Sequence, residues 1–237
     1  MRVKELWRYP VKSLQGERLP TAMLTADGLD GDRRYAIFDA DTGLGLTARR
    51  VPELLFASAA VTSDGRVWIK LPNDTIANGH DALSDWLGRR VVLRSADSNA
   101  GSRYENVVDF EQEHTSAWET FDGAPGPFHD SQRARVSLLS TATIGRWNPR
   151  RFRPNVLLDG AGEDSLIGCT VAIGEAILEV GQQIQRCVMV TRPQPDGIEP
   201  DLSVLRTIAR ERAANLAVGA LVNRPGTVRV GDELHRQ

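Results

Sequence analysis

The stretch RVWIKL, from Arg66 to Leu71, places Val67, Ile69 and Leu71 on one face of an extended chain. This period of two is typical of a β-strand. Other short apolar stretches, separated by turns rich in glycine and proline, lie on both sides of it: 3–8, 19–24, 35–38, 91–93, 136–139, 155–158, 170–173, 176–180, 187–191, 216–222 and 227–230. Helical spacing is confined to 80–87, 141–147 and 202–212, while 54–61 is compatible with a helix or a strand. Many short strands with few helices predict a mainly β (α+β) protein whose strands, mostly antiparallel, close into barrels.

The alternation stops between residues 95 and 135. This segment is polar, contains glycine and proline, and has no sustained periodicity. A structureless loop of that length is uncommon inside a compact domain and is usually a lid, a binding loop or a linker. We therefore predict two domains, 1–95 and 96–237, with the polar loop of about 95–135 at their junction.

The composition excludes several classes of protein. The 237 residues carry 29 Lys and Arg against 31 Asp and Glu, a net charge of −2, so there is no basic excess for nucleic acid and no polybasic run for an anionic membrane. No apolar run approaches transmembrane length, and the first residues lack the apolar core of a signal peptide. We expect a cytoplasmic protein without nucleic-acid or membrane partners.

Two basic motifs in the first part of the chain are candidates for anion recognition. In YPVKS, a proline fixes the backbone ahead of Lys12 and Ser13, whose ammonium and hydroxyl groups suit an anion; a turn with a solvated lysine is the alternative. In GDRRY, adjacent strand residues face opposite sides, so only one of Arg33 and Arg34 can point into a pocket. The other would be a surface charge that Asp32 could pair.

A third basic motif is RRFRPN, at 150–155. Its three arginines and one asparagine suit a phosphate and the edge of a heterocycle. Pro154 cannot donate to a strand ladder, so it belongs at the start of a strand and holds Arg153 at the rim, with Asn155 next to it. A basic surface turn is the alternative.

The chain has two cysteines without CxxC spacing, which excludes a disulfide scaffold, a closed zinc site and an iron–sulfur cluster. Cys187 follows Arg186, and a guanidinium beside a cysteine favours the thiolate, the form that binds metals or attacks. Soft sulfur ligands suit soft or sulfur-bridged metal centres. Without further context, however, a free cysteine is usually a small buried hydrophobic residue. Cys169, in the apolar stretch LIGC, has only that second interpretation.

Other catalytic signatures are absent from the sequence. The four histidines are scattered, and HExxH, GxSxG, P-loop and Rossmann motifs do not occur. A serine or cysteine hydrolase stays open, because its histidine partner can lie anywhere in the sequence. Glu111, Glu113 and His114 crowd one loop, for which a solvated acidic loop is favoured over a cation site.

Five stretches, taken in order, resemble the MOSC family, in the branch that pairs a MOSC N-terminal β-barrel domain with a MOSC domain and contains the mitochondrial amidoxime-reducing component and its bacterial relatives: YPVKSLQG, GLDGDRRYAIFDADTGLGLTAR, RFRPNVLLDG, RCVMVTRPQPDG and NRPGTVRVGDEL. The resemblance covers nearly the whole chain. It implies a MOSC N-terminal β-barrel-like domain packed on a MOSC β-barrel domain.

The resemblance also implies a cofactor, the molybdenum cofactor, which is molybdopterin with molybdenum. By motif position, residues from both halves would face the molybdopterin phosphate and pterin: Lys12, Ser13, Arg33, Arg153 and Asn155. Cys187 would be the thiolate ligand of the metal and the catalytic centre. Such a cofactor carries out the redox chemistry, while the protein binds, orients and tunes it.

The chain departs from the family pattern in three places. FHDSQRARVSLLS is longer and more basic than the short Asp-x-x-Pro segment common in the family, so the resemblance assigns no cofactor contact over 129–141, where Ser131 and Arg133 are candidates. The turn RPQPDG replaces an Asp-Pro pair, which suggests a different substrate access. No cysteine-rich ferredoxin module follows, so we expect electrons from a separate donor protein of ferredoxin, flavoprotein or cytochrome type.

The resemblance to the MOSC family implies three candidate functions. The first is a molybdenum-dependent oxidoreductase that reduces small N-hydroxylated or other N–O substrates. The second is a sulfur carrier that holds a persulfide on Cys187 for metal–sulfur or molybdenum cofactor maturation. The third is a carrier of the molybdenum cofactor without catalytic activity.

Overall fold

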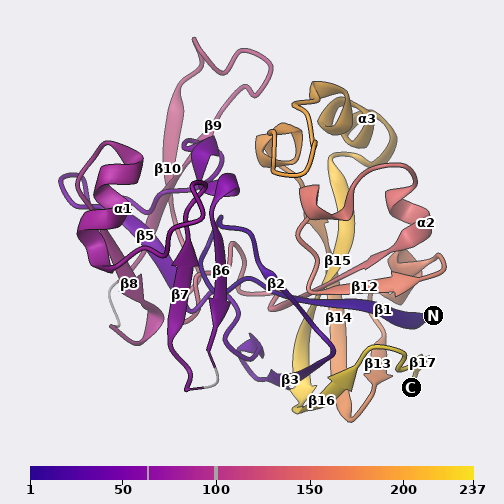
Figure 1. Ribbon diagram of the computed structural model, residues 1–237. Coiled ribbons are helices and arrows are strands. Elements are labelled where there is room, and N and C mark those ends of the chain that lie inside the picture. Colours follow the sequence, from indigo (N-terminus) through magenta and orange to yellow (C-terminus); the bar gives the residue numbers. More distant parts are fainter. Residues whose placement is uncertain (63, 99–100) are drawn as a thin grey trace.

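Strands dominate the computed structural model, which describes residues 1–62, 64–98 and 101–237 (Figure 1). The strands are β1 (Arg2–Arg8), β2 (Glu17–Leu19), β3 (Thr21–Thr25), β4 (Gly28–Leu29), β5 (Tyr35–Asp39), β6 (Ser58–Val61), β7 (Val67–Lys70), β8 (Val91–Ser95), β9 (Arg103–Val107), β10 (Trp118–Asp122), β11 (Val136–Ser140), β12 (Val156–Asp159), β13 (Thr170–Ile173), β14 (Ala176–Gln185), β15 (Asn215–Arg224), β16 (Gly226–Arg229) and β17 (Leu234–Arg236). The α-helices are α1 (Gly79–Leu87), α2 (Thr141–Ile144) and α3 (Leu202–Arg212). The 3₁₀ helices are η1 (Pro52–Phe56), η2 (Ala96–Ser98), η3 (Pro149–Arg151), η4 (Glu163–Leu166) and η5 (Val188–Thr191). The predicted mainly β architecture with a few short helices is confirmed.

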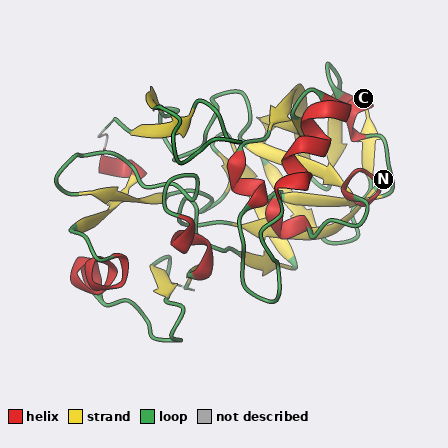
Figure 2. Ribbon diagram, turned by 90° about the horizontal axis from the view of Figure 1, so that it is seen from above, coloured by secondary structure: helices red, strands yellow, loops and turns green. Residues whose placement is uncertain are grey.

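The strands are divided between two lobes (Figure 1). The N-terminal lobe contains α1 and the two-stranded sheets β5–β8, β6–β7 and β9–β10. The C-terminal lobe contains an eight-stranded sheet in the order β17-β13-β14-β15-β11-β12-β1-β2, and the helices of this lobe lie against its strands (Figure 2). Its strand pairs are antiparallel except β11–β12, which is parallel.

The first strands of the chain complete the C-terminal lobe. β1 pairs with β12 and β2, and β3 pairs with β16. The loop after β1 contacts the N-terminal lobe, where Val11 pairs with Tyr35 and Gln15 pairs with Ser58, and after β4 the chain enters that lobe. Both termini lie on the C-terminal lobe (Figure 1). The domain boundary near residue 95 stays a prediction, while the sheet joins residues from both sides of it.

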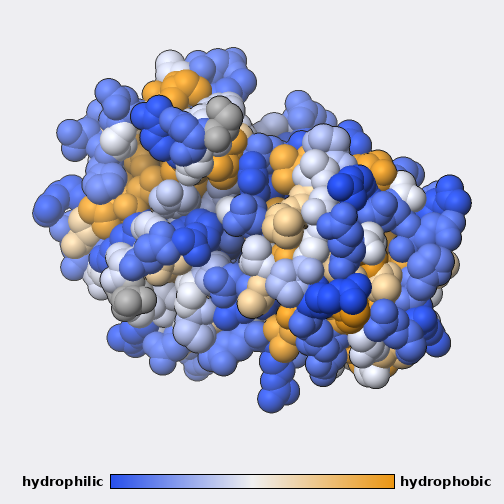
Figure 3. Space-filling view, turned by 90° about the horizontal axis from the view of Figure 1, so that it is seen from below, coloured by the Kyte–Doolittle hydropathy of each residue, from blue (hydrophilic) through white to orange (hydrophobic). Residues whose placement is uncertain are grey.

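Each lobe has its own apolar core. Ile69 and Leu71, on the face predicted by the alternation of RVWIKL, are buried in the N-terminal lobe together with Leu54. The eight-stranded sheet buries residues such as Leu6 and Val218. On the face seen from below, hydrophilic residues break the exposed apolar ones into separate groups (Figure 3). Within the described ranges, no helix is both long and apolar enough to cross a membrane.

The strand predicted over 187–191 is wrong. The chain forms the 3₁₀ helix η5 there, in which the Val190 amide donates to the Cys187 carbonyl at 3.2 Å. Val188, Val190 and Thr191 are all buried, so the residues show no alternation. A short apolar run has no period that separates a strand from a helical turn. The consequence is that Cys187 occupies the N-cap position of a helical turn rather than the start of a strand.

The predicted loop of 95–135 contains a β-hairpin. β9 and β10 pair from Trp118 opposite Val107 to Asp122 opposite Arg103. Tyr104 is fully buried at the base of this hairpin, and most of the other side chains are polar and exposed. A sheet of two short strands with polar outer faces produces almost no hydrophobic pattern, which is why the sequence did not reveal it.

Candidate functional site

A cavity of about 790 Å³ is lined by residues of both lobes. The structure brings to it all the residues predicted from the sequence motifs: Lys12, Ser13, Arg33, Arg153, Asn155 and Cys187. Five cationic side chains and one carboxylate line it: Lys12, Arg33, Arg49, Arg153, Arg186 and Asp130. Because cations outnumber carboxylates, the cavity suits an anionic ligand.

Lys12 and Ser13 lie in the loop that follows β1 and are both 6% exposed. The Lys12 amide donates to the Tyr35 carbonyl at 2.8 Å, which holds this loop against β5. Lys12 Nζ donates to the Phe128 carbonyl at 2.9 Å and to Asp130 at 2.6 Å. Burial lowers the pKa of Lys12, and Asp130 opposes this effect. The ammonium is therefore fixed in place and faces the cavity.

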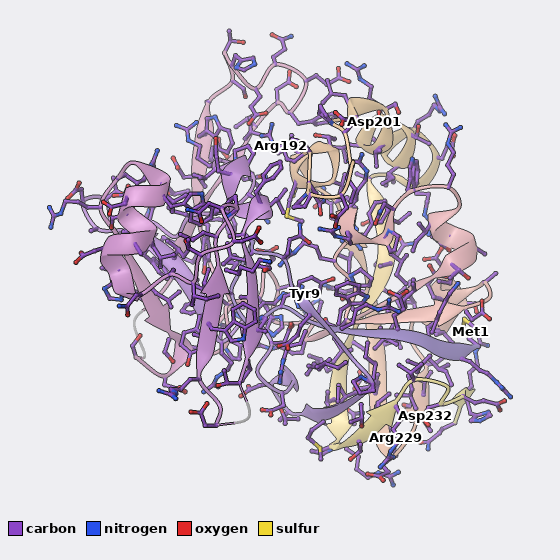
Figure 4. The ribbon with its side chains drawn as sticks, viewed as in Figure 1. Met1, Tyr9, Arg192, Asp201, Arg229 and Asp232 are labelled. Atoms are coloured by element: carbon purple, nitrogen blue, oxygen red, sulfur yellow. The ribbon has the colours of Figure 1, made fainter. Side chains whose placement is uncertain are left out.

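Two arginines from distant parts of the chain pack around the Tyr9 ring. The Arg153 and Arg33 guanidinium carbons lie 4.2 Å and 5.0 Å from the ring centroid. Arg153 also donates to the Leu14 carbonyl at 2.5 Å, and Arg33 forms an ion pair with the buried Asp32. Tyr9 lies between the two lobes (Figure 4). This stack joins the YPVKS, GDRRY and RFRPN motifs into one wall.

The GDRRY motif sends its two arginines to different places through a turn and not through the predicted strand alternation, because both precede β5 and Arg33 has a φ of 50°. Asp32 also has a different partner from the one expected. Arg33 lines the cavity, and Arg34 forms an ion pair with Asp97. The sequence analysis assigned Asp32 to whichever arginine lies at the surface, and this is wrong because Asp32 pairs with the cavity arginine. The Asp32 carboxylate also accepts from the Tyr9 amide at 2.7 Å, so it anchors the base of the stack.

Asn155 lines the cavity, but its amide is engaged by the protein. Its Oδ1 accepts from the Ser137 amide and hydroxyl at 3.2 Å and 3.0 Å, and its Nδ2 donates to the Trp7 carbonyl at 3.3 Å. These bonds tie β1, β11 and the start of β12 together. Asn155 therefore holds the wall of the cavity in position.

Cys187 lies beside a guanidinium that the sequence analysis missed. Arg49 Nε donates to Cys187 Sγ at 3.3 Å, while Arg49 Nη2 lies 3.1 Å from Asp130. The sequence neighbour Arg186 donates instead to the Leu216 and Phe152 carbonyls, at 2.7 Å and 3.0 Å. Arg49 therefore provides a charged hydrogen-bond donor at the Cys187 sulfur.

Asp130 connects the two sides of the site, because its carboxylate oxygens bind Lys12 and Arg49 separately. Its side chain is 58% exposed and faces the cavity. Desolvation raises its pKa, but Arg49 and Lys12 outweigh this effect and hold the pKa well below its ordinary value. Asp130 is therefore ionised and orders the two cations.

Several residues of the site have strained backbones. Ser13, Arg33 and Arg153 adopt φ angles of 70°, 50° and 52°, in the left-handed region that favours glycine. Residues kept in that region at a cost of about 1–3 kcal/mol are typical of functional sites. Here the strain is retained at positions whose side chains line the cavity.

Buried polar groups without partners also line the cavity. Within the described part of the chain, Thr47 Oγ1, His129 Nε2 and Arg186 Nη2 are buried and form no hydrogen bond. Burial, aided by Arg33, lowers the pKa of His129 to about 3, so its imidazole is neutral. Such groups are normally hydrogen-bonded, so a bound ligand with acceptor atoms would satisfy them.

The segment 129–141, for which the resemblance assigned no cofactor contact, lines the cavity with residues that the sequence analysis did not select. Ser131 lines the cavity and accepts from Gln182 Nε2 at 3.3 Å, whereas Arg133 is exposed and does not line it. His129 and Asp130, which the sequence analysis did not select, both line it. In the sequence, FHD directly precedes the candidate Ser131, and this proximity was the signal that could have identified His129 and Asp130.

The fold and site together define a class of protein. It has two β lobes, and the cavity between them presents several buried cations and one thiol in contact with a guanidinium. Residues 1–113 match the MOSC N-terminal beta barrel domain, and residues 98–235 match the MOSC domain. The chain therefore belongs to the MOSC domain family, as the resemblance predicted.

Curated relatives are about 25% identical to this chain over the aligned residues. The mitochondrial amidoxime-reducing component 1 of Mus musculus is 25% identical over 98% of this chain and 81% of its own length. The human protein of that name is 24% identical, over 98% and 82%. The molybdenum cofactor sulfurase of Drosophila grimshawi is 25% identical over 91% of this chain, and the match spans only 31% of the sulfurase.

Solved structures resemble the chain more distantly. The YUAD protein from Bacillus subtilis is 12% identical with a TM-score of 0.45, covering 98% of this chain and 93% of that protein. YiiM from Geobacillus stearothermophilus is 17% identical with a TM-score of 0.37, covering 50% and 67%.

Proposed function

We propose that the cavity binds the molybdenum cofactor with Cys187 as the thiolate ligand of the metal, and that the protein is an oxidoreductase that reduces N-hydroxylated or other N–O compounds. The observation that carries the proposal is the position of Cys187. Its thiol lines the same cavity as Lys12, Arg33 and Arg153, and a guanidinium donates to its sulfur.

The lining residues fit a phosphorylated pterin. Lys12 and the buried arginines suit the phosphate, and the unpartnered Arg186 Nη2 and Thr47 Oγ1 offer hydrogen bonds to further acceptors. The neutral His129 imidazole offers one more polar edge for the heterocycle. The cavity of about 790 Å³ lies within the range of small-molecule and cofactor sites.

The thiol fits a metal that brings most of its own ligands. Among the described residues, no cluster of three His, Cys, Asp or Glu could hold a metal ion. A metal beside Cys187 would therefore take its other ligands from a bound small molecule, as it does when a pterin carries it. When bound, this cofactor supplies two-electron redox chemistry.

The residues around the thiol would act through position and charge. Arg49 donates a hydrogen bond to Cys187 Sγ, and Asp130 keeps Arg49 and Lys12 in their places. The strained backbones of Arg33 and Arg153 preorganise the anion-binding wall before a ligand arrives.

The reaction needs a small substrate and a separate electron donor. An N-hydroxylated compound gains two electrons and two protons, its N–O bond breaks, and water leaves. The relatives named amidoxime-reducing component support this substrate class. We propose a donor protein of ferredoxin, flavoprotein or cytochrome type.

A sulfur carrier is the second candidate. The Arg49–Cys187 contact would also stabilise a persulfide anion, and the matched relatives include molybdenum cofactor sulfurases. Mass spectrometry that finds a stable persulfide on Cys187, together with the absence of pterin from the purified protein, would favour this function.

Metal analysis and pterin fluorescence test the proposal on protein made in a host that synthesises the cofactor. We expect about one molybdenum and one pterin per chain, and activity with a reduced donor and an amidoxime. Cys187→Ala should lower molybdenum retention at least about tenfold, because the metal loses its protein ligand. Cys169→Ala is the matched control. Equal retention and activity in Cys187→Ala would rule out the proposed role.

A further inference from the structure

The tip of the β9–β10 hairpin, residues 108–117, lies at the edge of the cavity. Asn106, Val107, Val108 and Phe110 line the cavity from this hairpin. Opposite them the C-terminal lobe contributes residues of η5 and α3, among them Met189 and Leu205. The hairpin and the helices therefore form two sides of the cavity, and they belong to different lobes.

The base of the hairpin is anchored in the N-terminal lobe. Tyr104 is fully buried there, and its ring centroid lies 6.2 Å from that of Phe38. The Gly45 amide donates to the Arg103 carbonyl at 2.7 Å. Beyond this base, the hairpin is a sheet of two strands, which is marginally stable without further packing.

The tip is held on the C-terminal lobe by three contacts, which we name the latch. Glu113 forms an ion pair with Arg192, and both side chains are largely buried, at 21% and 17% exposure. Glu111 lies 2.8 Å from Arg206 of α3, and this pair is exposed. Phe110 packs against the apolar cluster formed by α3, η5 and neighbouring strands.

The latch is connected to the reactive centre. Arg192 Nη2 donates to the Arg49 carbonyl at 2.7 Å in addition to binding Glu113. Arg49 in turn donates to Cys187 Sγ. Arg192 lies between the hairpin and the segment that leads to α3 (Figure 4). Opening the latch would therefore free a wall of the cavity without separating the two lobes.

We propose that the tip 108–117 is a gate, and that its latch determines the size of the molecules that reach Cys187. The lobes stay joined, because the loop after β1 bridges to the N-terminal lobe, where Val11 pairs with Tyr35 and Gln15 pairs with Ser58. Among the residues that the structure describes, the contacts of Glu111, Glu113 and Phe110 are those that must break for the tip to swing on the hairpin base. Few contacts and two ion pairs are typical of a segment that opens locally. The gate depends on the cavity alone and does not require the proposed reaction.

Alkylation of Cys187 measures the gate in full-length protein made in a host that cannot synthesise molybdopterin. Iodoacetamide and a bulky N-aryl iodoacetamide carry the same reactive group, and peptide mass spectrometry separates Cys187 from Cys169. We expect Glu113→Gln to speed the reaction with the bulky reagent about fivefold, since it removes one partner of the largely buried pair. The rate of alkylation by iodoacetamide should rise less, because this smaller reagent needs a smaller opening. Glu119→Gln, an exposed carboxylate on β10, is the control and should change neither rate.

Salt provides a second measurement on the unaltered protein. Raising NaCl from about 0.05 M to 0.5 M screens the exposed pair of Glu111. The bulky reagent should then react faster with the wild type, and the Glu111→Gln/Glu113→Gln double variant should not respond. Equal acceleration of both reagents in Glu113→Gln would indicate a change in the thiol itself and would overturn the gate. At low salt, rates in the double variant that equal those of the wild type would overturn it as well.

Discussion

The two cysteines lie in regions of the molecule that differ in charge and in surroundings. Both thiols are free and partly buried. Cys187 faces the cavity, where Arg49 donates to its sulfur. Cys169 lies in what we call the Cys169 corner, formed by η4, the turn 167–169, β13 and β17, where it packs against the apolar core. Its Sγ contacts the Ser165 carbonyl at 3.8 Å.

The backbones of the two regions differ in the same way. In the Cys169 corner, the left-handed φ angles belong to glycines such as Gly162 and Gly168. In the cavity they belong to residues with side chains, among them Ser13, Arg33 and Arg153. In the corner, glycine adopts the left-handed backbone conformation with little strain. In the cavity, residues with side chains adopt it despite the strain. This difference indicates that the cavity is shaped for a ligand.

The largest expected difference concerns a histidine from each region. The ordinary pKa of histidine is about 6.5, and burial, aided by Arg33, lowers that of His129 to about 3. Between these pH values the unfolded chain binds a proton that the folded chain does not, so stability is lost as pH falls below 6.5. We expect wild type to lose about 2 kcal/mol more than His129→Gln between pH 7 and pH 5. Urea unfolding at both pH values measures this.

The control for that experiment is His235→Gln, on β17 of the Cys169 corner. The His235 side chain is 66% exposed, so this variant makes the same chemical change outside the cavity. An identical pH dependence in wild type and His129→Gln would show that His129 is not buried in its neutral form.

The next difference concerns the arginine of each region. Arg49→Gln removes the charged donor to Cys187 Sγ, and we expect alkylation of Cys187 by iodoacetamide at pH 7 to slow about tenfold in metal-free protein. In the corner, Arg236 donates to the Ser165 carbonyl and hydroxyl at 2.5 Å and 2.6 Å. Arg236→Gln should therefore not slow alkylation of Cys169. An unchanged Cys187 rate in Arg49→Gln would remove the chemical distinction between the two thiols.

A smaller effect tests the backbone difference. Arg153→Gly and Arg153→Ala remove the same interactions, but alanine keeps a Cβ at a φ of 52°. We expect the glycine variant to be more stable by about 1 kcal/mol in thermal or urea unfolding. Gly168→Ala is the reciprocal change, at a φ of 80° where an added Cβ would meet no atom within 4 Å. It should cost about 1 kcal/mol for conformational reasons alone. Equal stability of the two Arg153 variants would mean that the backbone relaxes.

The smallest effect is expected for Cys169 itself. Cys169→Ala removes a partly buried sulfur from the edge of the core and should cost about 0.5 kcal/mol of stability. Molybdenum content should not change. A loss of molybdenum in this variant would place the two cysteines in one functional class and contradict the comparison.

Much of the fold could be predicted from local pattern. RVWIKL and similar stretches predicted the strands, and 80–87 and 202–212 predicted α1 and α3. The failures lie where the pattern carries no information. The apolar run 187–191 has no period, and the β9–β10 hairpin exposes polar residues on most of its surface.

The candidate site was predicted in part. Lys12, Arg33 and Arg153 were found because each lies in a motif with a proline or a glycine turn beside it. Arg49 and Asp130 were missed, because their contacts join loops that are far apart in the sequence. Only the folded chain places them next to Lys12 and Cys187.

X-ray absorption at the molybdenum edge tests the central claim most directly. The measurement counts sulfur neighbours of the metal in cofactor-loaded wild type, Cys187→Ser and Cys169→Ser. The account predicts one sulfur neighbour fewer in Cys187→Ser than in wild type, and no change in Cys169→Ser. The same sulfur count in Cys187→Ser and wild type, at equal molybdenum content, would contradict it.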